Sequence, residues 1–427
     1  MFHRPPSAAA ASSSPNLLLP PQKGATSPES HLRSASLVNL PAEENGQAEI
    51  EKPPKLQEFS KQSPFGALLS RTLPNYTGPY SVGVRDLEVP IPRQSFGTFR
   101  HKRMPHVDAG IVVDTVLFTV FYPCEPQEKP KYVAWFPNRG FIVAAIEHRD
   151  GTSPSSTIVA ADGATTTLDW IQWSDLDWPE LSEQPKDDSV LRREQIKCRV
   201  AEIEAVIETM QQISKGEAPN ELLKKPDASV WSAWRLVDAS RPVLAGHSLG
   251  GSAALAVSAK DSYDYRAVVA FDPALQRLLP WESSLPRPIL VVNSEEVMEH
   301  EFKESFEIFA KTATSDLQVY TISGTTHPSF SDVFLILPDA INKLTGLHCA
   351  ADVVLERVVR ATEEYLSGEG GAGGYVSYDD VLREEEDGAD SIEPPAKGKR
   401  RHFWRHSSGD QGGKMYKSVG KSAESLA

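Results

Sequence analysis

The sequence predicts an α/β fold built around a doubly wound, mostly parallel sheet. Short, continuously apolar runs such as Phe141–Glu147 alternate with segments whose apolar residues recur every three or four positions. Such runs are typical of strands buried on both faces, and their alternation with helices indicates crossovers between parallel strands. One of the apolar runs ends in a serine placed between glycines, at Gly246–Gly250. This position, at the end of a strand, is where α/β proteins carry their sites.

The composition indicates one folded domain between two tails. The 427 residues have an apolar share of 40%, which is low for a wholly globular chain. Residues 1–62 are rich in serine, proline and alanine and show no hydrophobic period, so we predict a disordered tail. Residues 367–427 combine a glycine stretch with acidic and basic clusters, and we predict a second disordered tail there. Residues 63–366 are predicted to form the α/β domain.

Charge and cysteine content limit the partners and the location. The net charge of −14 argues against a nucleic-acid partner. Cys124, Cys198 and Cys349 are odd in number and far apart, so they form neither a disulfide framework nor a metal-binding spacing. No apolar run approaches the ~18 residues of a membrane span, and Leu17–Leu19 is too short for a signal-peptide core. We therefore expect a cytoplasmic protein in a reducing compartment.

The tails contain two short segments with an alternative interpretation. Arg33–Ser36 resembles a kinase site, although a solvated tail explains it as well. The basic run Lys397–Arg401, followed by Phe403 and Trp404, suggests a possible peripheral contact with an anionic membrane, against the simpler interpretation of a solubilising tail. Nothing in the sequence indicates an oligomeric state.

The predicted strands are apolar runs bounded by turn-forming residues. We expect Phe141–Glu147 to be fully buried, and Val112–Tyr122 to be one strand or one arm of a hairpin. In chain order the predicted strands are Val112–Tyr122, Phe141–Glu147, Pro242–Ala245, Arg266–Phe271, Pro288–Asn293 and Leu317–Ile322.

Three helices are predicted from hydrophobic spacing and end signals. The longest begins near Asp188, carries apolar residues spaced mostly by three and four over Val190–Met210, and is followed by Gly216. A helix rich in small residues is predicted at Gly251–Ala259, and a last amphipathic helix at about Ala350–Tyr365.

The motif Gly246–Gly250 has the G-x-S-x-G pattern of a nucleophile elbow. It follows the predicted strand Pro242–Ala245 and precedes a helix, which is the context in which a strained turn exposes the serine hydroxyl. The alternative is an ordinary strand-to-helix turn in which Ser248 caps the helix. The elbow interpretation predicts the α/β-hydrolase fold over residues 63–366, with Ser248 as the nucleophile.

A serine nucleophile needs a base, and the base needs an orienting acid. In hydrolases of this fold the partners follow in the order Ser, Asp/Glu, His. Asp272 comes directly after a predicted strand, and His327 lies in a turn-rich loop after a later strand. His300 lies in a charged helical segment and His348 in a loop before the final helix, so both are weaker candidates. An isolated histidine is otherwise a surface or core residue, but its loop favours His327 as the base.

The identity of the acid is open at this point. Many hydrolases of this fold carry the acid one strand later, which would select Glu295 or Glu296. Asp272 has a shorter side chain and follows its strand without intervening residues. These two features favour Asp272.

The chain resembles the platelet-activating-factor acetylhydrolase family, in its type II, plasma-type branch, which includes fungal members. The resemblance covers about residues 78–335, and its first two blocks are quite specific. The residues that carry it are Gly78–Gly83, Gly140–Asp150, Gly246–Gly251, Asn293–Glu295 and Gly324–Asp332.

The resemblance implies a reaction and a set of residue roles. The family's triad maps onto Ser248, Asp272 and His327, and its reaction is calcium-independent hydrolysis of the short sn-2 acyl group of a phospholipid. No cofactor or metal is implied, and a phospholipid is the expected partner. Residues 147–149 (Glu-His-Arg) are implied to be structural residues near the site.

The oxyanion site is where the sequence departs from the family. The backbone N–H of Leu249 would supply one donor, and the family's second donor comes from a His-Gly pair after the third strand. No His-Gly dipeptide occurs in this sequence. Only the 17 residues 124–140 separate Pro123 from Phe141, and they would have to hold a strand, such as Tyr132–Phe136, a loop and a crossover helix. A parallel crossover alone needs a dozen or more residues.

We therefore predict an internal deletion near residues 124–140, through a skipped exon or a gene-model error, with the second oxyanion donor missing. The alternatives are that the neighbouring strand is absent from the sheet or that the connection differs from the family's. The leading prediction is a serine esterase of the acetylhydrolase type, with impairment by the deletion left open. A general lipase or carboxylesterase, or a catalytically dead, truncated paralogue that binds lipid or a partner, are the alternatives.

Overall fold

The structure is a computed structural model. It describes residues 80–103, 110–124, 135–160, 162–223, 231–297, 300–367, 376–377 and 415–418. Met1–Pro53 separate from the rest of the chain as a unit of their own and lie outside these residues. The predicted tails 1–62 and 367–427 fall almost entirely outside them, so their disorder stays a prediction. The account below concerns the second unit, Pro54–Ala427.

The first sheet contains three antiparallel strands in the order β1–β3–β4. β1 pairs with β3 so that Leu87 lies opposite Phe118, and Phe118 lies opposite Ile146 on β4. The buried side chains of β1 and β3 pack in a core cluster with Val206 of the long helix α2 (Ser189–Ser214). The strand bounds are β1 Ser81–Phe96, β3 Ile111–Cys124 and β4 Val143–Glu147.

The second sheet has the order β12–β13–β11–β10–β9–β8, and β8 to β11 are parallel. Successive side chains of these strands point to opposite faces, and both faces are covered. Leu290 and Val292 face the cluster that includes α8, whereas Ile289 and Val291 face the cluster that includes α4 and α5. The strand bounds are β8 Val243–His247, β9 Ala267–Phe271, β10 Ile289–Ser294, β11 Leu317–Ile322, β12 Val376–Ser377 and β13 Met415–Ser418.

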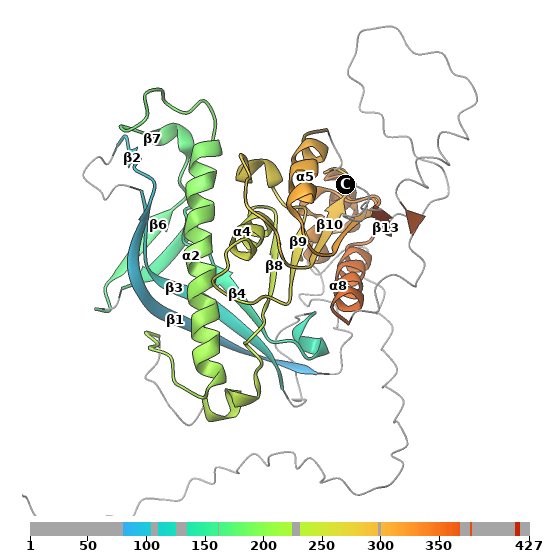
Figure 1. Cartoon of the computed structure of the whole chain (residues 1–427), viewed down its shortest axis with the longest axis horizontal. Helices are drawn as coiled ribbons and strands as arrows, with labels where there is room; N and C mark the ends of the chain where they lie inside the picture. Colours follow the sequence, from blue (N-terminus) through green and yellow to red (C-terminus); the bar gives the residue numbers. More distant parts are fainter. Residues whose placement is uncertain are drawn as a thin grey trace, which may run out of the picture. The chain divides into compact units, whose positions relative to one another are not determined.

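The helices complete a doubly wound arrangement in which α2 lies between the strands of the first sheet and α4, which covers the second sheet (Figure 1). One side of α2 packs on β1, β3 and β4, and another packs on α4. Within the described residues no helix is long and apolar enough to cross a membrane. The bounds are α4 Leu249–Ser258, α5 His300–Thr312, α6 Val333–Ile336, α7 Asp339–Leu344 and α8 Ala351–Ser367.

Shorter elements lie between these. β2 pairs with β7, and β5 and β6 form a hairpin between β4 and α2. The bounds are β2 Arg100–His101, η1 Pro137–Arg139, β5 Ser155–Val159, β6 Thr165–Asp169, η2 Trp173–Asp175, β7 Leu176–Asp177, η3 Ser232–Leu236, η4 Leu275–Leu278 and η5 His327–Phe330.

The structure confirms the predicted α/β class and places the predicted strands other than Tyr132–Phe136, and the three predicted helices, within a few residues of their expected bounds. One expectation is wrong: β4 is not fully buried, since Ala145 and Glu147 are exposed. The reason is its position, because β4 pairs with β3 on one side only. The hairpin β5–β6 and the short helices α6 and α7 were not predicted, since segments of four to six residues carry too little periodicity.

The two sheets are separate among the strands that the structure describes. β4 pairs with β3 alone and β8 with β9 alone, so no ladder joins β4 to β8. Most of the predicted strand Tyr132–Phe136 lies outside the described residues, and Trp135 and Phe136 form a turn before η1. The side chain of Trp135 packs against the core cluster that contains Val269 and Leu290. The predicted deletion near residues 124–140 stays a prediction.

Candidate active site

The turn between β8 and α4 has the backbone of a nucleophile elbow. Ser248 has φ of 56° and ψ of −123°, a region that non-glycine residues rarely adopt. A Cβ atom on Gly246 would collide with the backbone of Gly250, so the turn closes only with a glycine at the first position. The N–H of Ser248 donates to the carbonyl of Phe271 on the next strand, over 2.9 Å. This contact holds the strained residue against β9.

Three predicted residues meet at the carboxyl ends of three parallel strands. His327 Nε2 lies 2.9 Å from Ser248 Oγ, and His327 Nδ1 lies 3.2 Å from Asp272 Oδ2. Ser248 follows β8, Asp272 follows β9, and His327 begins η5 after β11. A carboxylate only accepts hydrogen bonds, so Nδ1 carries the proton and Nε2 presents its lone pair to the serine hydroxyl. This is the donor pattern of a serine–histidine–aspartate triad.

The acid side chain is fully buried and held by a residue that the sequence did not reveal. The backbone N–H of Ser294 donates to Asp272 Oδ1 and its hydroxyl to Asp272 Oδ2, both over 2.5 Å. Asp272 itself has a positive φ of 41°. Ser294 ends β10, the strand next to the one that Asp272 follows. In the sequence, Ser294 stands out only as a polar residue at the end of an apolar strand. Its contact with Asp272 depends on the order of the strands in the sheet, which comes from the structure.

The alternative acids hold the backbone of the histidine loop. Glu296 Oε2 accepts the N–H of His327 over 2.7 Å, and Glu295 Oε2 accepts the N–H of Gly324 over 2.8 Å. Asp272 is the carboxylate at Nδ1 of the imidazole. The geometry therefore favours Asp272 as the orienting acid, with the two glutamates as positioning residues.

The electrostatics of the site raise the pKa of His327. Its hydrogen bond to Asp272 raises the pKa of His327 above its ordinary value, partial burial opposes this, and the negative charges of Asp272 and Glu296 add to the rise. An imidazole with a raised pKa is a stronger base toward the serine hydroxyl at neutral pH.

His247 links the elbow to the histidine loop. Its Nε2 lies 2.9 Å from the backbone carbonyl of His327, and the centroids of the two rings are 4.7 Å apart. Since a carbonyl only accepts, Nε2 of His247 carries a proton. Burial, and next the charge of His327, lower the pKa of His247, so this ring is a neutral donor. The ring of Phe330 packs on the other side, with centroids 5.6 Å apart.

Of the two weaker histidine candidates, the structure describes the side chain of His348 alone. His348 donates its backbone N–H to the carbonyl of Gly324 over 2.8 Å, which closes the loop that carries His327. The side chain of His300 lies outside the described part of the structure. Within the loop, the hydroxyl of Ser329 accepts the backbone N–H of Thr326 over 2.9 Å. These bonds keep the loop in one conformation.

Leu249 stands where an oxyanion donor is expected. It is the first residue of α4, so its N–H has no acceptor within the helix. The segment 125–134, in which a second donor was sought, lies outside the described residues. The missing second donor therefore stays a prediction.

His247, Asp272 and His327 also offer ligand atoms within 4.8 Å of one another, and they are the one such group in the described residues. The two histidines already use these atoms in hydrogen bonds to a carbonyl, a carboxylate and a hydroxyl. A metal ion would have to break those bonds. The donor set fits proton transfer better than metal binding.

Buried ion pairs surround the segment His148–Asp150 behind the elbow. His148 Nδ1 lies 2.6 Å from Glu202 Oε2, and Arg149 pairs with Glu88 on β1. Asp150 pairs with Arg199 of α2 over 2.7 Å. These contacts fit the structural role implied for residues 148–149, whereas Glu147 is exposed.

Comparison with known proteins identifies the family of the chain. The family model "Platelet-activating factor acetylhydrolase, isoform II" matches residues 138–371, which is more than half of the chain. The chain belongs to this family. The match includes all three residues of the site and begins at the end of the segment in which the deletion is predicted.

Individual acetylhydrolases are similar over about half their length. The chain is 30% identical to the platelet-activating factor acetylhydrolase of Canis lupus familiaris over 202 residues, which is 46% of this chain and 43% of that protein. It is 27% identical to that of Gallus gallus over 222 residues, 49% of this chain and 50% of that one. A solved structure, a ferulic acid esterase from Streptomyces cinnamoneus, overlaps 68% of this chain and 89% of its own, with 16% identity and a TM-score of 0.41.

Proposed function

We propose that this acetylhydrolase-family chain is a serine carboxylic-ester hydrolase. Its proposed substrates are phospholipids with a short sn-2 acyl group, such as platelet-activating factor, which carries an acetyl group. The observation that supports this most strongly is the position of His327 between Ser248 and Asp272, with hydrogen-bond distances of 2.9 and 3.2 Å. The nucleophile, the base and the acid are all protein side chains, so the proposed reaction uses no calcium.

The proposed reaction has two halves. Ser248 Oγ attacks the sn-2 carbonyl carbon while its proton passes to His327 Nε2, and Asp272 stabilises the imidazolium. The N–H of Leu249 donates to the oxyanion. When the intermediate collapses, the C–O bond to glycerol breaks and the lysophospholipid oxygen takes the proton from His327. Water then attacks the acyl-serine by the same route, which releases the acid and restores Ser248.

The proposed enzyme is impaired if one oxyanion donor is missing. Loss of one donor costs on the order of 10²–10³ in kcat. Inserting a typical family segment at residues 137–140 and comparing hydrolysis of a short-chain ester tests this part. A gain on that order supports impairment, and equal rates with and without the insert would contradict it.

We also propose a peripheral contact with membranes and a cytoplasmic location. Support for the contact comes from α6 and α7, which follow the His327 loop and expose large apolar side chains. Leu344 is 87% exposed, and a group of exposed apolar side chains on neighbouring elements is typical of a membrane or protein interaction site. The exposed apolar residues of the two helices are Val333, Ile336, Ile341 and Leu344.

A fluorophosphonate probe tests the serine mechanism separately from the substrate. The wild-type chain is expected to be labelled, and Ser248→Ala is expected to lose the label. Absence of labelling in the wild type would favour the non-catalytic paralogue. Rates on acetyl and long-chain esters of the same phospholipid, measured with a calcium chelator, then separate an acetylhydrolase from a general lipase, which prefers the long chain.

A further inference from the structure

Three side chains of α2 hold the segment that follows β4. Gln195, Arg199 and Glu202 lie on one face of the helix, because they are spaced by four and three residues. Gln195 Nε2 donates to the carbonyl of Asp150 over 2.9 Å, and Glu202 Oε1 accepts the N–H of Arg149 over 2.9 Å. Arg199 binds side chains of the same segment. The reaction proposed above uses none of these three residues.

The guanidinium of Arg199 uses two of its three nitrogens in this segment. Its Nε donates to Asp150 Oδ2 over 2.7 Å, and its Nη2 donates to Thr152 Oγ1 over 2.9 Å. Burial raises the pKa of Asp150, but the charge of Arg199 and the hydrogen bonds from Thr152 and Arg199 outweigh it, so this pKa lies below its ordinary value. Asp150 is therefore a charged and fully buried anchor, and Arg199, which is 8% exposed, is fixed to it.

The third nitrogen of Arg199 lies beside the nucleophile elbow. A Cβ atom on Gly250 would lie 3.9 Å from Nη1 of Arg199 and, apart from its own helix and chain neighbours, would have no other described atom within 4 Å. No described residue accepts a hydrogen bond from this nitrogen. Since Gly250 has no side chain, the guanidinium occupies the space that the first turn of α4 leaves open toward α2.

The other side of the same turn is held by hydrogen bonds to the segment after β9. Ser252 Oγ donates to the carbonyl of Ala274 over 3.0 Å, and the N–H of Ala274 donates to the carbonyl of Ser248 over 3.2 Å. No ladder of the described strands joins β4 to β8, so strand pairing does not hold the turn on the side of the first sheet. Arg199 spans that side, from the segment after β4 to the start of α4.

We propose that Arg199 is a positioning residue for the oxyanion donor. Leu249, whose N–H is the expected donor, lies between Ser248 and Gly250 in the turn that the guanidinium borders. The bonds to Asp150 and Thr152 fix the guanidinium, and the guanidinium keeps the first turn of α4 from shifting toward α2.

The position of this turn matters for the rate of the reaction. A donor stabilises the oxyanion only when its N–H points at the oxygen, so a small shift of the turn lowers kcat. The inference rests on the proposed function for the reaction, whereas the position of the turn can be measured without turnover.

Arg199→Lys removes the bridge but keeps its charge. A single ammonium lacks the planar fork of the guanidinium, so it cannot bind the segment after β4 and also fill the space beside Gly250. The buried carboxylate keeps a positive partner, and the variant is therefore expected to fold. Arg149→Lys is the matched control, because Arg149 is also buried and belongs to the same segment, but its guanidinium pairs with Glu88 of the first sheet.

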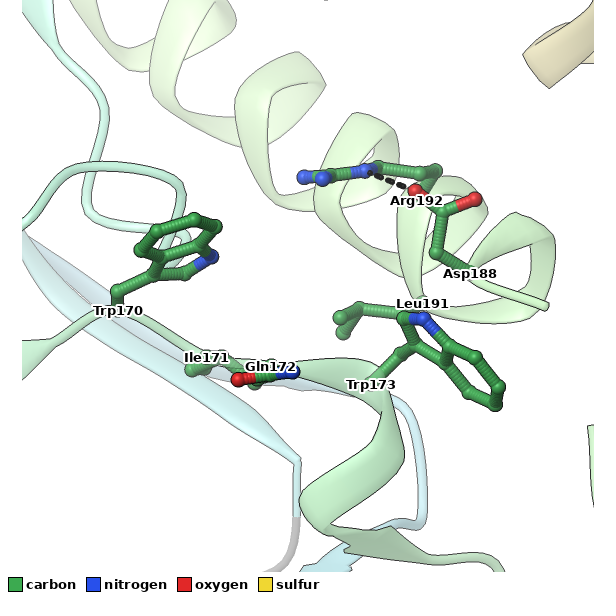
Figure 2. Close-up of a pocket in the computed structure, with 7 residues that line it drawn as sticks. All are labelled: Trp170, Ile171, Gln172, Trp173, Asp188, Leu191 and Arg192. Atoms are coloured by element: carbon green, nitrogen blue, oxygen red, sulfur yellow. Dashed lines mark hydrogen bonds and ion pairs between the residues drawn. The ribbon is translucent and has the colours of Figure 1, made fainter.

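Arg192→Lys controls for a change elsewhere on α2. Figure 2 shows Arg192 beside a small hollow at the start of the helix, where its Nε lies 3.0 Å from Asp188 Oδ2. Arg192 precedes Arg199 by about two helical turns, or about 10 Å along the axis. Lysine keeps the charge that faces Asp188, so this variant is expected to leave the elbow unchanged.

Amide exchange tests the position of the turn in the full chain. Mass spectrometry would follow the peptide that contains the hydrogen-bonded amides of Ser248 and Ser252. We expect their exchange to be at least about tenfold faster in Arg199→Lys than in the wild type, and within about threefold of the wild type in Arg149→Lys and Arg192→Lys. Unchanged exchange in Arg199→Lys, or an equal increase in either control, would overturn the proposal.

Hydrolysis of p-nitrophenyl acetate is the second test. Arg199→Lys is expected to lower kcat about tenfold with KM within about twofold, because the donor acts on the intermediate rather than on the bound substrate. Both controls should keep kcat within about threefold of the wild type. A rise in KM alone, or an equal loss of kcat in the controls, would overturn the positioning role. If the wild type hydrolyses no ester but Arg199→Lys still loosens the turn, the proposed function fails while the positioning of the turn stands.

Discussion

Ser294 and His327 share one oxygen of Asp272. The hydroxyl of Ser294 lies 2.5 Å from Oδ2, and Nδ1 of His327 lies 3.2 Å from the same atom. A hydroxyl that donates to an oxygen stabilises its negative charge and makes it a weaker acceptor for a second donor. Ser294 therefore limits how strongly Asp272 raises the pKa of His327, in addition to fixing the carboxylate in place.

Replacing Ser294 by alanine is expected to change the pH profile as well as the rate. Without the hydroxyl, Asp272 accepts more strongly from His327, so the acidic limb of kcat/KM moves to higher pH. Loss of a donor to a buried carboxylate is also expected to lower the free energy of unfolding by about 1–3 kcal/mol. Rate profiles and urea unfolding measure the two effects.

Ser323→Ala is the control for that experiment. Ser323 follows β11, and its buried hydroxyl has no hydrogen-bond partner among the described residues. It should shift neither the profile nor the stability by a comparable amount. An unchanged pH profile in Ser294→Ala would show that the hydroxyl has a purely structural role.

Asp272→Asn distinguishes the acid from the two glutamates. The amide keeps the shape of the side chain but presents the wrong hydrogen-bonding group to Nδ1, and we expect kcat to fall on the order of 10⁴. Glu296→Gln keeps an oxygen for the N–H of His327 and should lose less than about tenfold, the scale of one hydrogen bond. Comparable losses in both variants would contradict the assignment of Asp272. Steady-state kinetics on a short ester measures both.

The activity should depend on pH through His327. The base must be neutral, and its pKa is raised above the ordinary 6.5, so kcat/KM should decline with an apparent pKa above 6.5 as the pH falls. The contribution of His327 to the free energy of unfolding changes with pH in the opposite direction. A folded-state pKa above the unfolded value contributes stability that is complete below the unfolded pKa and is lost as the pH rises through the folded pKa. A rate profile with its midpoint below 6.5 would contradict this.

His247→Phe should weaken the link between the elbow and the histidine loop. The variant removes the donor to the carbonyl of His327 but keeps a ring beside Phe330. We expect kcat to fall by about tenfold, the scale of one hydrogen bond, with KM little changed. His247→Gln, which can still donate, should recover part of the loss. A change in KM alone would argue against a positioning role.

Leu344→Glu should reduce binding to lipid vesicles while hydrolysis of a soluble ester stays the same. Leu344 is 87% exposed, so the substitution removes no packing contact of the folded chain. Co-sedimentation with phosphatidylcholine vesicles measures the effect. Lys343→Gln changes the net charge by the same one unit at the neighbouring exposed residue, so it controls for charge alone.

The local parts of the fold and site were predictable, and the long-range parts were not. The elbow at Ser248 is a short motif, and Asp272 and His327 each follow a recognisable strand. Ser294 could not be assigned, because its contact depends on β10 lying next to β9, which no local pattern encodes. The burial of β4 was overestimated for the same reason, since it depends on which strand lies at its second edge.

Because no ladder of the described strands joins β4 to β8, the helix α2 is the main connection between the three-stranded sheet and the sheet that carries the triad. Because no backbone hydrogen bonds of the described strands join these two sheets, the opening of one sheet is not coupled to the opening of the other through a shared ladder. Amide exchange should therefore separate the chain into two foldons, with β1, β3 and β4 opening at lower free energy than β8 to β11. The triad would then survive in a state whose first sheet has already opened.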